Sequence, residues 1–314
     1  MVLLLLLGAL GTLLRQPTLG SDSVAGLPAA DPSALRRHVE HLAKRCTPRS
    51  ADNPIGLRCA ANYIHLAFAD SGAEVGEQVF QARGSAYRNV VARFGPAGEG
   101  LTVIGAYYDS FGLFGPNPGA DDNASGVAGL LELARLLGQK PPPSEVELVA
   151  YANEEPPFFG TPLMGSAVHA RSLHGSGRSL EAMICLEMIG YFTLRQPWPS
   201  LLHRLLYPDR GDFIGIVGRF ADRRLARRLK RAFRGATSVP AYSLSAPRWM
   251  PDLDASDHRS YWAEGYPAVM VTDTAFIRNP HYHGPDDTPE TLDYERMAGV
   301  VNGIMNAVSL PQGR

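Results

Sequence analysis

Five side chains of this sequence could together hold metal ions and move protons. Each lies just beyond an apolar, strand-like run, and the five are Asp122, Glu154, Glu155, Glu187 and His283. Carboxylate oxygens and imidazole nitrogens are donors that bind zinc in catalytic sites. The series therefore predicts an enzyme with a co-catalytic zinc centre, in which a carboxylate bridges two metal ions.

The simplest chemistry for such a centre is hydrolysis of an amide bond. This reaction needs an activated water, an electrophile for the carbonyl oxygen and a proton shuttle, and paired zinc ions supply the first two. Asp122 suits the bridging position because it lies in a turn-rich loop before an expected helix, where Asp121 and Asn123 are interpreted as turn and capping residues. Of the adjacent Glu154 and Glu155, one can bind metal while the other carries the proton.

These residues need a scaffold that brings strand ends together. Apolar spacing predicts helices near residues 31–43, 54–69, 123–137 and 222–233, after Met164 and from about Tyr294, and strands at 74–81, 88–94, 101–106, 145–151, 182–186, 213–217 and 268–271. Strands that alternate with helices predict an α/β fold whose largely parallel sheet is covered on both faces. Ligands of such sheets bind beyond the carboxyl ends of the strands, where Tyr107, Asp109, Glu154 and Glu187 all fall.

Length and composition fit one catalytic domain, expected over residues 24–314. The chain has 314 residues, of which 45% are hydrophobic and 19% charged, and its net charge is -1. A chain of this kind can bury a large core. Nothing in the charge balance indicates a nucleic-acid partner.

The first residues form a separate segment. Residues 1–14 are almost all aliphatic, Arg15 follows, and a stretch rich in Pro, Gly and Ser runs to Ser23. A run this short fits the core of a signal peptide better than a membrane span of about 20 residues, although no basic residue precedes it. We expect residues 1–23 to be a signal peptide or an N-terminal anchor of an exported, periplasmic or extracellular protein. A misassigned start codon and a frayed terminus are the alternatives.

Three cysteines bear on the compartment. Cys46 and Cys59 flank a polar turn between two expected helices, and in an oxidising compartment they could form a disulfide. Two partly buried thiols are the equally weighted alternative. Cys185 lies in an apolar run and is expected to pack in the core, because free cysteine behaves as a small hydrophobe.

Residues 190–251 are richer in Pro, Trp, Tyr and Arg than the rest of the chain and are expected to wall a pocket. Within them, residues 222–233 predict a basic amphipathic helix with an apolar stripe of Leu225, Leu229 and Phe233. A solvated polar face is the favoured interpretation of its basic residues, and docking on an anionic surface is the other.

Longer motifs give the sequence a resemblance to a known family. They are Gly119-Ala-Asp-Asp-Asn-Ala-Ser-Gly-Val-Ala-Gly-Leu-Leu-Glu-Leu-Ala-Arg135, Asn153-Glu-Glu155 with Met164-Gly-Ser166, Leu186-Glu-Met-Ile-Gly-Tyr191, Ser256-Asp-His258 and Asn279-Pro-His-Tyr-His-Gly-Pro-Asp-Asp-Thr288. Over residues 39–308 the chain closely resembles the co-catalytic zinc peptidases that include the bacterial leucyl aminopeptidases and, more distantly, glutamate carboxypeptidases and glutaminyl cyclases. The resemblance implies a three-layer α/β/α fold with a mixed, mostly parallel central sheet.

The resemblance also implies roles by position. Asp122 would bridge two Zn²⁺ ions, Glu154 would act as general base, and Glu155 with His283 would complete one zinc site. Glu187 would join the other zinc, at a position where the family more often has aspartate. Glutamate offers the same donor atoms on a longer arm.

Two aromatic positions near His283 need separate interpretation. Tyr282 resembles the family's tyrosine that donates a hydrogen bond to the tetrahedral oxyanion, with a packed aromatic side chain as the alternative. The Tyr-His order of the motif favours His283 over His281 as the ligand. His258, at the start of an expected helix, either lies near the site or is a structural histidine.

Tyr107 departs from the family, which has histidine at this position, oriented by the residue equivalent to Asp109. A phenol has a pKa of about 10 and must lose its proton to ligate well, although an adjacent cation can drive that loss. We therefore expect the zinc shared by Asp122 and Glu187 to be weak or absent, so that one or two zinc ions bind. The other site is complete, with three protein ligands and a place for water.

The sequence thus predicts an exported zinc-dependent exopeptidase, and in particular an aminopeptidase that cleaves peptide substrates at the amino end. Its activity is expected to fall if the first metal site is impaired. Two alternatives stay open. Tyr107 also fits a catalytically silent binding domain that kept the fold, and the surviving aspartate, glutamate and histidine match the single zinc of a glutaminyl cyclase-like acyltransferase.

Overall fold

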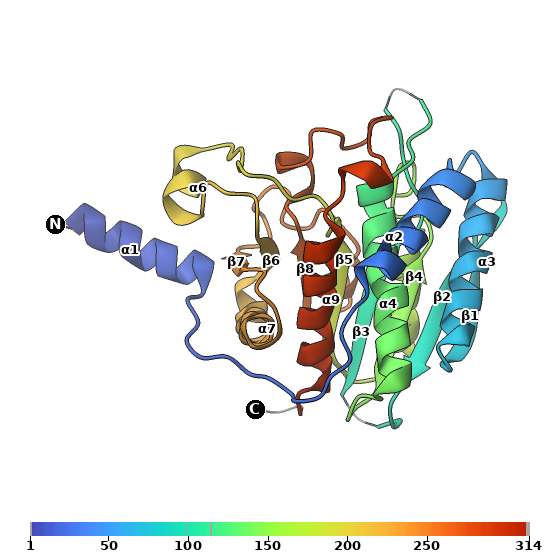
Figure 1. The fold of residues 1–314 in the computed structure, drawn as a ribbon, viewed down its shortest axis with the longest axis horizontal. Coiled ribbons are helices and arrows are strands. Elements are labelled where there is room, and N and C mark those ends of the chain that lie inside the picture. Colours follow the sequence, from blue (N-terminus) through green and yellow to red (C-terminus); the bar gives the residue numbers. More distant parts are fainter. Residues whose placement is uncertain (1, 99, 114, 312–314) are drawn as a thin grey trace.

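The buried apolar runs of the sequence assemble into one eight-stranded sheet (Figure 1). The computed structural model describes residues 2–98, 100–113 and 115–311. The strands are β1 (Glu74–Ala82), β2 (Ser85–Phe94), β3 (Leu101–Tyr107), β4 (Val146–Tyr151), β5 (Leu180–Glu187), β6 (Ile214–Arg219), β7 (Ala241–Ala246) and β8 (Ala268–Thr272). Their order across the sheet is β1-β2-β4-β3-β5-β8-β6-β7.

The centre of the sheet is parallel and its margins are mixed. Strands β4, β3, β5 and β8 run parallel to one another, whereas β2 is antiparallel to β4 and β6 is antiparallel to β8. Strands buried on both faces appear as continuous apolar runs, and every residue of β3, β4 and β8 is buried. The edge strand β1 has a mixed pattern instead.

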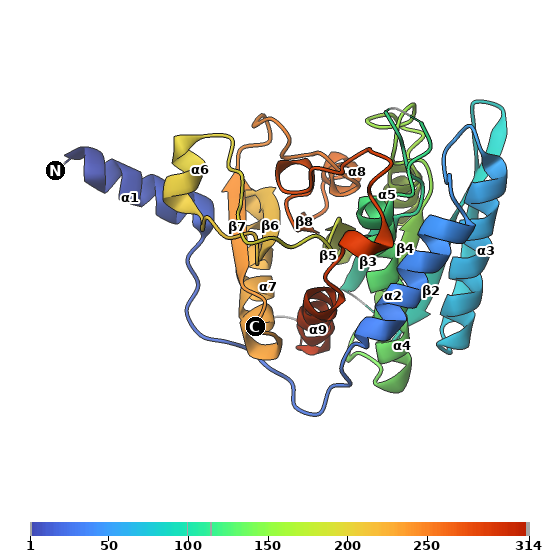
Figure 2. The ribbon, with the colours of Figure 1, turned by 45° about the horizontal axis from the view of Figure 1, so that its top comes forward.

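Helices cover both faces of the sheet (Figures 1 and 2). They are α1 (Val2–Arg15), α2 (Pro32–Glu40), α3 (Pro54–Asp70), α4 (Gly126–Gln139), α5 (Gly165–Gly175), α6 (Leu201–Leu206), α7 (Arg223–Ala236), α8 (His258–Ala263) and α9 (Tyr294–Ser309), with short turns at His41–Arg45, Ala120–Ser125, Phe220–Asp222, Ala275–Ile277 and Pro289–Thr291. On one face α4 packs against α2, α3 and α9, and α9 packs against α7; on the other, α5 packs against α8. The expected three-layer α/β/α fold with a mixed, mostly parallel sheet is therefore confirmed.

Local sequence explains where the main helices begin. The carboxylate of Asp31 accepts a hydrogen bond from the backbone N–H of Ser33, and that of Asp293 accepts one from Arg296, so both residues cap the helices that follow them. Helix α6 and strand β7 were not predicted from the sequence. Strand β7 is an edge strand with the sequence Ala-Tyr-Ser-Leu-Ser-Ala, in which serines interrupt the apolar residues, so it gives no apolar run to detect.

The N-terminal segment packs against the body of the protein. Helix α1 contacts β7, and Leu14 and Gln16 are buried. The ammonium group of Lys230, on α7, donates hydrogen bonds to the backbone carbonyls of Arg15, at 2.7 Å, and of Gln16. The expected segment 1–23 begins with Met1, which lies outside the described residues. Within the described parts of the chain, no helix is both long and apolar enough to cross a bilayer.

The basic helix α7 holds this segment in place. Arg231 forms an ion pair with Asp22 at 2.7 Å, and Arg234 donates to the backbone carbonyls of Thr18 and Gly20. The interpretation of a solvated face holds for Arg223, Arg224, Arg227 and Arg234, which are exposed, but not for Lys230, which is buried. The contacts with residues 15–22 were not predicted, because these partners lie about two hundred residues away in sequence and no local pattern indicates them.

Candidate metal centre

Strand ends bring the predicted residues together. Tyr107 ends β3, Glu187 ends β5, and Glu154 and Glu155 follow the end of β4 by three and four residues. Asp122 lies in the turn Ala120–Ser125 that leads into α4. The loop after β8 carries His283, whose backbone carbonyl accepts a hydrogen bond from the N–H of Leu113 at 3.1 Å.

The backbone around these residues takes uncommon conformations. Asn153, Met188 and His283 all have positive φ, at 63°, 51° and 56°. Residues without a glycine's freedom rarely adopt this region, and such strain gathers at functional sites. Before Asp122, Gly119 has φ 58°, and a Cβ there would lie 2.4 Å from the Asp122 carbonyl oxygen, so the loop requires glycine.

Three of the predicted ligands converge, and we call Asp122, Glu155 and His283 the three-donor group. Each offers one donor atom, and these atoms all lie within 4.8 Å of one another. The Nε2 atom of His283 is 3.2 Å from Asp122 Oδ2 and 3.4 Å from Glu155 Oε1. All three atoms are buried without a hydrogen-bond partner. Two carboxylates and an imidazole with unpartnered atoms at this spacing fit a divalent cation such as zinc.

The electrostatics of the three-donor group also favour a cation. Burial lowers the pKa of His283, but the adjacent carboxylates of Asp122 and Glu155 outweigh it and raise the value to about 10. Burial and the charge of Asp122 raise the pKa of Glu155 to about 8. Without a metal ion, a protonated imidazole thus supplies the positive charge that the two carboxylates need.

Tyr107 joins the three-donor group to Glu187. Its hydroxyl lies 2.5 Å from Asp122 Oδ1 and 2.9 Å from Glu187 Oε1. Burial, with the charges of both carboxylates, raises the Tyr107 pKa well above 10, so the phenol keeps its proton. A phenol has only one proton to donate, so its contacts with two carboxylates need a second proton. Burial likewise raises the pKa of Glu187, so Glu187 can hold that proton. Tyr107 and Glu187 thus lie outside the three-donor group, and their ligation of a second metal stays a prediction.

Two aspartates hold the loops that carry Glu154, Glu155 and Asp122 by their backbones. Asp109, expected to orient residue 107, accepts hydrogen bonds from the backbone N–H groups of Glu154 and Glu155 at 3.1 and 3.0 Å. Asp287 accepts hydrogen bonds from those of Asp121 and Asp122 at 2.9 and 3.0 Å. Both carboxylates therefore act as rigid frames for the chain that carries the ligands.

Some positioning residues escaped the sequence analysis. Ser256 donates a hydrogen bond to Glu187 Oε2, and Asp287 holds the backbone of Asp121 and Asp122. Both residues lie in the family motifs quoted above, but neither was predicted to have a role. Arg49 is wholly buried and donates to the backbone carbonyls of Tyr108 and Gly119, both at 2.8 Å. No sequence signal marks Arg49, because its partners are backbone atoms of distant loops.

An apolar cavity of about 410 Å³ adjoins the centre. Glu187 and Tyr282 line it, and most other walls come from residues 198–217, 242–255 and 270–277, with Leu14 contributing from α1. This supports the expectation that residues 190–251 wall a pocket. The Tyr282 ring stacks on His283, with ring centres 3.8 Å apart, so one side chain contacts both the three-donor group and the cavity.

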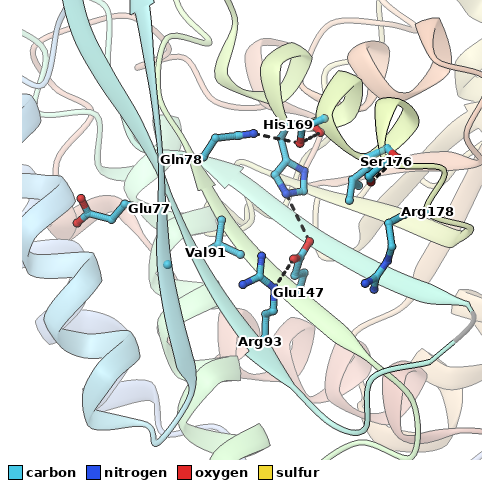
Figure 3. A pocket seen from close by; sticks show the side chains of 11 residues that line it. Glu77, Gln78, Val91, Arg93, Glu147, His169, Ser176 and Arg178 are labelled. Carbon is cyan, nitrogen blue, oxygen red and sulfur yellow. Dashed lines mark hydrogen bonds and ion pairs between the residues drawn. The ribbon is translucent and has the colours of Figure 1, made fainter.

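A second cavity, of about 480 Å³, lies between α5 and the β1–β2–β4 margin (Figure 3). Its charged groups neutralise one another: Glu147 pairs with Arg93 at 2.7 Å and with His169 at 3.4 Å. Arg178 pairs with Glu145 at 2.6 Å. None of the predicted site residues lines it, and His169 is a buried structural residue.

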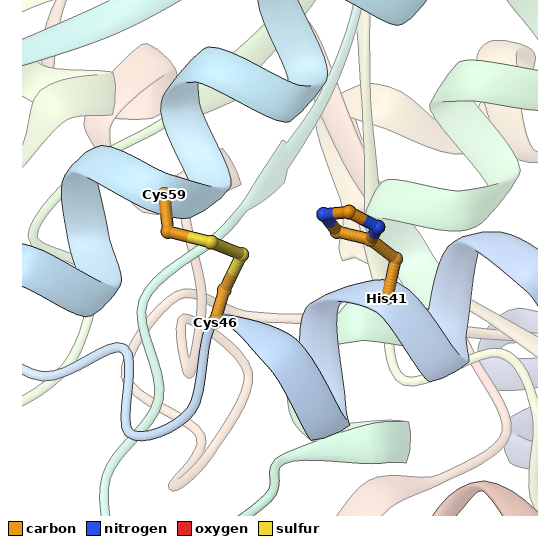
Figure 4. Close-up of side chains that lie close together, drawn as sticks. All are labelled: His41, Cys46 and Cys59. Carbon is orange, nitrogen blue, oxygen red and sulfur yellow. A yellow bond between two sulfur atoms is a disulfide. The ribbon is translucent and has the colours of Figure 1, made fainter.

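His41, Cys46 and Cys59 also lie close together (Figure 4). The two sulfur atoms form a disulfide, which is the first of the two alternatives for these cysteines. Because neither sulfur is a thiolate, this cluster does not suit a metal ion. Cys185 is buried in the core, as expected.

His258 and His281 are not in the three-donor group. His258 is fully buried, its Nε2 lies 2.8 Å from the Leu253 carbonyl oxygen, and its ring meets that of Trp262 edge to face. It is therefore a structural histidine. The His281 ring packs edge to face against Tyr191, so His283 is the histidine that the motif delivers to the centre.

The family model described as "Peptidase family M28" matches residues 89–308, which include the whole centre. The chain belongs to this family. A protein of Escherichia coli K12, the uncharacterized protein YfbL, is 48% identical over 286 residues, which cover 88% of this chain and 87% of that protein. Leucine aminopeptidase 1 of Fusarium vanettenii is 29% identical over 67% of this chain and 51% of its own length. This M28 chain thus spans about half of the curated leucine aminopeptidases it matches.

Solved structures share the fold of this M28 peptidase. A leucine aminopeptidase precursor of Bacteroides thetaiotaomicron has a TM-score of 0.71 at 18% identity, covering 92% of this chain and all of that one. A glutaminyl cyclase of the same organism, bound to N-acetylhistamine, has a TM-score of 0.69 at 18% identity, covering 91% and 100%. At these identities the likeness concerns the fold alone.

Proposed function

We propose that the protein is a zinc-dependent aminopeptidase that works with one zinc ion, held by the three-donor group. The observation that carries this proposal is the set of three unpartnered donor atoms beside Glu154, at the edge of an apolar cavity. The family and the leucine aminopeptidase relatives support the hydrolytic reaction.

A zinc ion bound there would polarise the scissile carbonyl and lower the pKa of water. Glu154 is 4% exposed and follows a strained residue, and its backbone N–H is fixed by Asp109. Burial and the neighbouring Glu155 raise the pKa of Glu154 well above its ordinary value. Such a carboxylate accepts a proton from water and returns it to the leaving amine. We assign the Tyr282 hydroxyl to the developing oxyanion.

The apolar cavity and Glu187 account for recognition of the amino end. Glu187 lines the same cavity as Tyr282. Its two oxygens already contact Tyr107 and Ser256, but each has a further lone pair that can accept a hydrogen bond from the substrate's ammonium group. The cavity walls include Phe213, Leu253 and Met270. We therefore assign the cavity to the side chain of an apolar N-terminal residue, since burial of apolar surface favours binding there.

The Cys46–Cys59 disulfide supports an exported protein, because disulfides are rare in reducing cytosol. Export as a periplasmic or extracellular protein remains our proposal for its location.

The test compares three peptides on the zinc-loaded full chain. We expect release of leucine from Leu-Gly-Gly, no release from N-acetyl-Leu-Gly-Gly, and slower release of alanine from Ala-Gly-Gly, all abolished by a chelator and restored by zinc. Cleavage of the acetylated peptide would contradict the role given to the ammonium group. No turnover of any peptide would favour the silent binding domain.

A second candidate is a glutaminyl cyclase-like acyltransferase. The three-donor group matches the single-zinc ligand set expected for it from the sequence, and glutaminyl cyclases are among the structural neighbours. Incubation with Gln-Phe-Ala distinguishes the two. Release of ammonia with an intact chain would identify a cyclase, whereas release of free glutamine would identify an aminopeptidase.

A further inference from the structure

Exposed leucines gather where α1 and α6 lie side by side, at the end of the molecule far from α3 (Figures 1 and 2). The two helices touch there, because a Cβ built on Gly11 would lie 3.0 Å from the Leu206 side chain. The leucine surface, as we call it, consists of α1 and α6 side chains that are 38% to 70% exposed: Leu10, Leu13, Leu201, Leu202 and Leu205. Helix α6 buries none of its residues. A cluster of large aliphatic side chains left in water indicates an interaction surface.

The last turn of α1 and the residues after it pack against the body of the protein. Leu14 is 6% exposed and Gln16 is 3% exposed. The Gln16 side chain accepts hydrogen bonds from Arg227 at 2.7 and 3.0 Å, and Ser243 donates to the Arg15 carbonyl at 2.7 Å. Cleavage near residue 23 would remove all these contacts. The geometry therefore favours a mature protein that keeps α1.

The charged residues near the leucine surface indicate which kind of partner it binds. Residues 8–21 and 194–210 carry four arginines against one acidic residue, Asp209. Of these, Arg195 and Arg204 are exposed, and Arg204 lies on α6 between Leu202 and Leu205 in the sequence. Aliphatic side chains flanked by arginine are the composition of helices that lie in the interface of an anionic bilayer, with the leucines among the acyl chains and the guanidinium groups at the phosphates.

We propose that the leucine surface docks on an anionic lipid bilayer, with α1 and α6 lying in the interface. This orientation has a consequence for the centre. Leu14, Leu202 and Leu206 also line the apolar cavity that Glu187 and Tyr282 share with the centre. Docking therefore places the edge of the substrate cavity at the lipid surface, and the protein would meet its substrates there.

Sedimentation with vesicles tests the proposal independently of any activity. The full chain is mixed with vesicles of equal parts phosphatidylcholine and phosphatidylglycerol, or of phosphatidylcholine alone. We expect pelleting with the mixed vesicles, weaker pelleting with the neutral ones, and loss of binding as the ionic strength rises. The variant Leu201→Asp with Leu205→Asp should lower the partition coefficient at least tenfold.

The chain offers a matched control on α3. Ile55 and Leu66 are 70% and 63% exposed, against 70% and 66% for Leu201 and Leu205, and α3 lies at the other end of the sheet. The variant Ile55→Asp with Leu66→Asp should pellet like the unmodified chain, and both variants should keep its thermal unfolding midpoint. Equal pelleting of the α6 variant and the control would overturn the proposal, as would no pelleting of the unmodified chain. A dimer in light scattering that the α6 variant abolishes, without vesicle binding, would assign the surface to a second copy instead.

Discussion

The two halves of the centre are built from the same kinds of atoms and differ in how those atoms are satisfied. In the three-donor group, the donor atoms of Asp122, Glu155 and His283 are buried and have no hydrogen-bond partner. In the other half, Tyr107 contacts Glu187 Oε1 at 2.9 Å and Ser256 donates to Oε2. One half therefore presents donor atoms that a cation would satisfy, and in the other the polar atoms are paired by hydrogen bonds.

This difference is the physical basis for our proposal that Tyr107 limits the centre to one metal ion. Buried polar atoms cost free energy unless they are paired, so a site for a metal ion must leave its donors unpaired within the protein. Tyr107 supplies a proton donor at the position where the family has a ligand. Together with a proton held by Glu187, it satisfies Asp122 Oδ1 and Glu187 Oε1, and we expect this to disfavour a second cation.

Removing a ligand from the three-donor group should have the largest effect. In His283→Ala the group loses its only nitrogen donor, and we expect zinc to fall from about one equivalent to none, with kcat at least about 10³ lower. Elemental analysis after dialysis and a peptide assay measure both. His281→Ala, two residues away, is the matched control and should keep its zinc. Loss of zinc in the control alone would mean that the wrong histidine is assigned.

Glu154→Gln should separate proton transfer from metal binding. The amide keeps the shape of the side chain but cannot take a proton, so kcat should fall by about 10² to 10⁴ while zinc content stays unchanged. Glu74, 80% exposed at the sheet edge, gives the matched control Glu74→Gln, which should retain full activity. A variant Glu154→Gln that loses its zinc would instead make Glu154 a ligand.

The three-donor group could be predicted from the sequence, whereas the hydrogen bonds that Tyr107 makes in the other half could not. Strand ends located Glu155, Glu187 and the loop of His283, because parallel strands end at one edge. Tyr107 was recognised as a departure, but its two hydrogen bonds depend on side-chain positions from β3, β5 and the turn before α4. The same holds for the basic residues of α7, whose partners in residues 15–22 no local pattern reveals.

Substitutions at Tyr107 should change metal number without touching the three-donor group. In Tyr107→His the imidazole replaces the phenol between Asp122 and Glu187, and we expect a second, more weakly held zinc equivalent. Tyr107→Phe removes the hydroxyl but adds no ligand, so it should stay at one equivalent and lose about 1–3 kcal/mol of metal-free stability. Isothermal titration calorimetry with zinc measures the number of zinc ions that each variant binds. One equivalent in both variants would show that Glu187 is not placed to share a metal, whereas two in the phenylalanine variant would contradict the blocking role of the hydroxyl.

The smallest effect concerns a histidine whose surroundings are the opposite of those of His283. His38 packs beside the Tyr63 hydroxyl at 2.7 Å, and burial, then Arg37, lower its pKa to about 4. The unfolded chain takes up a proton at this residue near pH 6.5, whereas the folded chain does so only near 4, so stability is retained above about pH 6.5 and lost as the pH falls towards 4. Because part of the ring is exposed to solvent, we expect His38 to lower the free energy of unfolding by only about 1–3 kcal/mol over this pH range. Urea unfolding of the metal-free chain and of His38→Gln at pH 7.5 and 5 measures this, and the variant should show the shallower decline. Equal declines would mean that other groups carry the acid sensitivity, and the contrast between the two histidines would then rest on His283 alone.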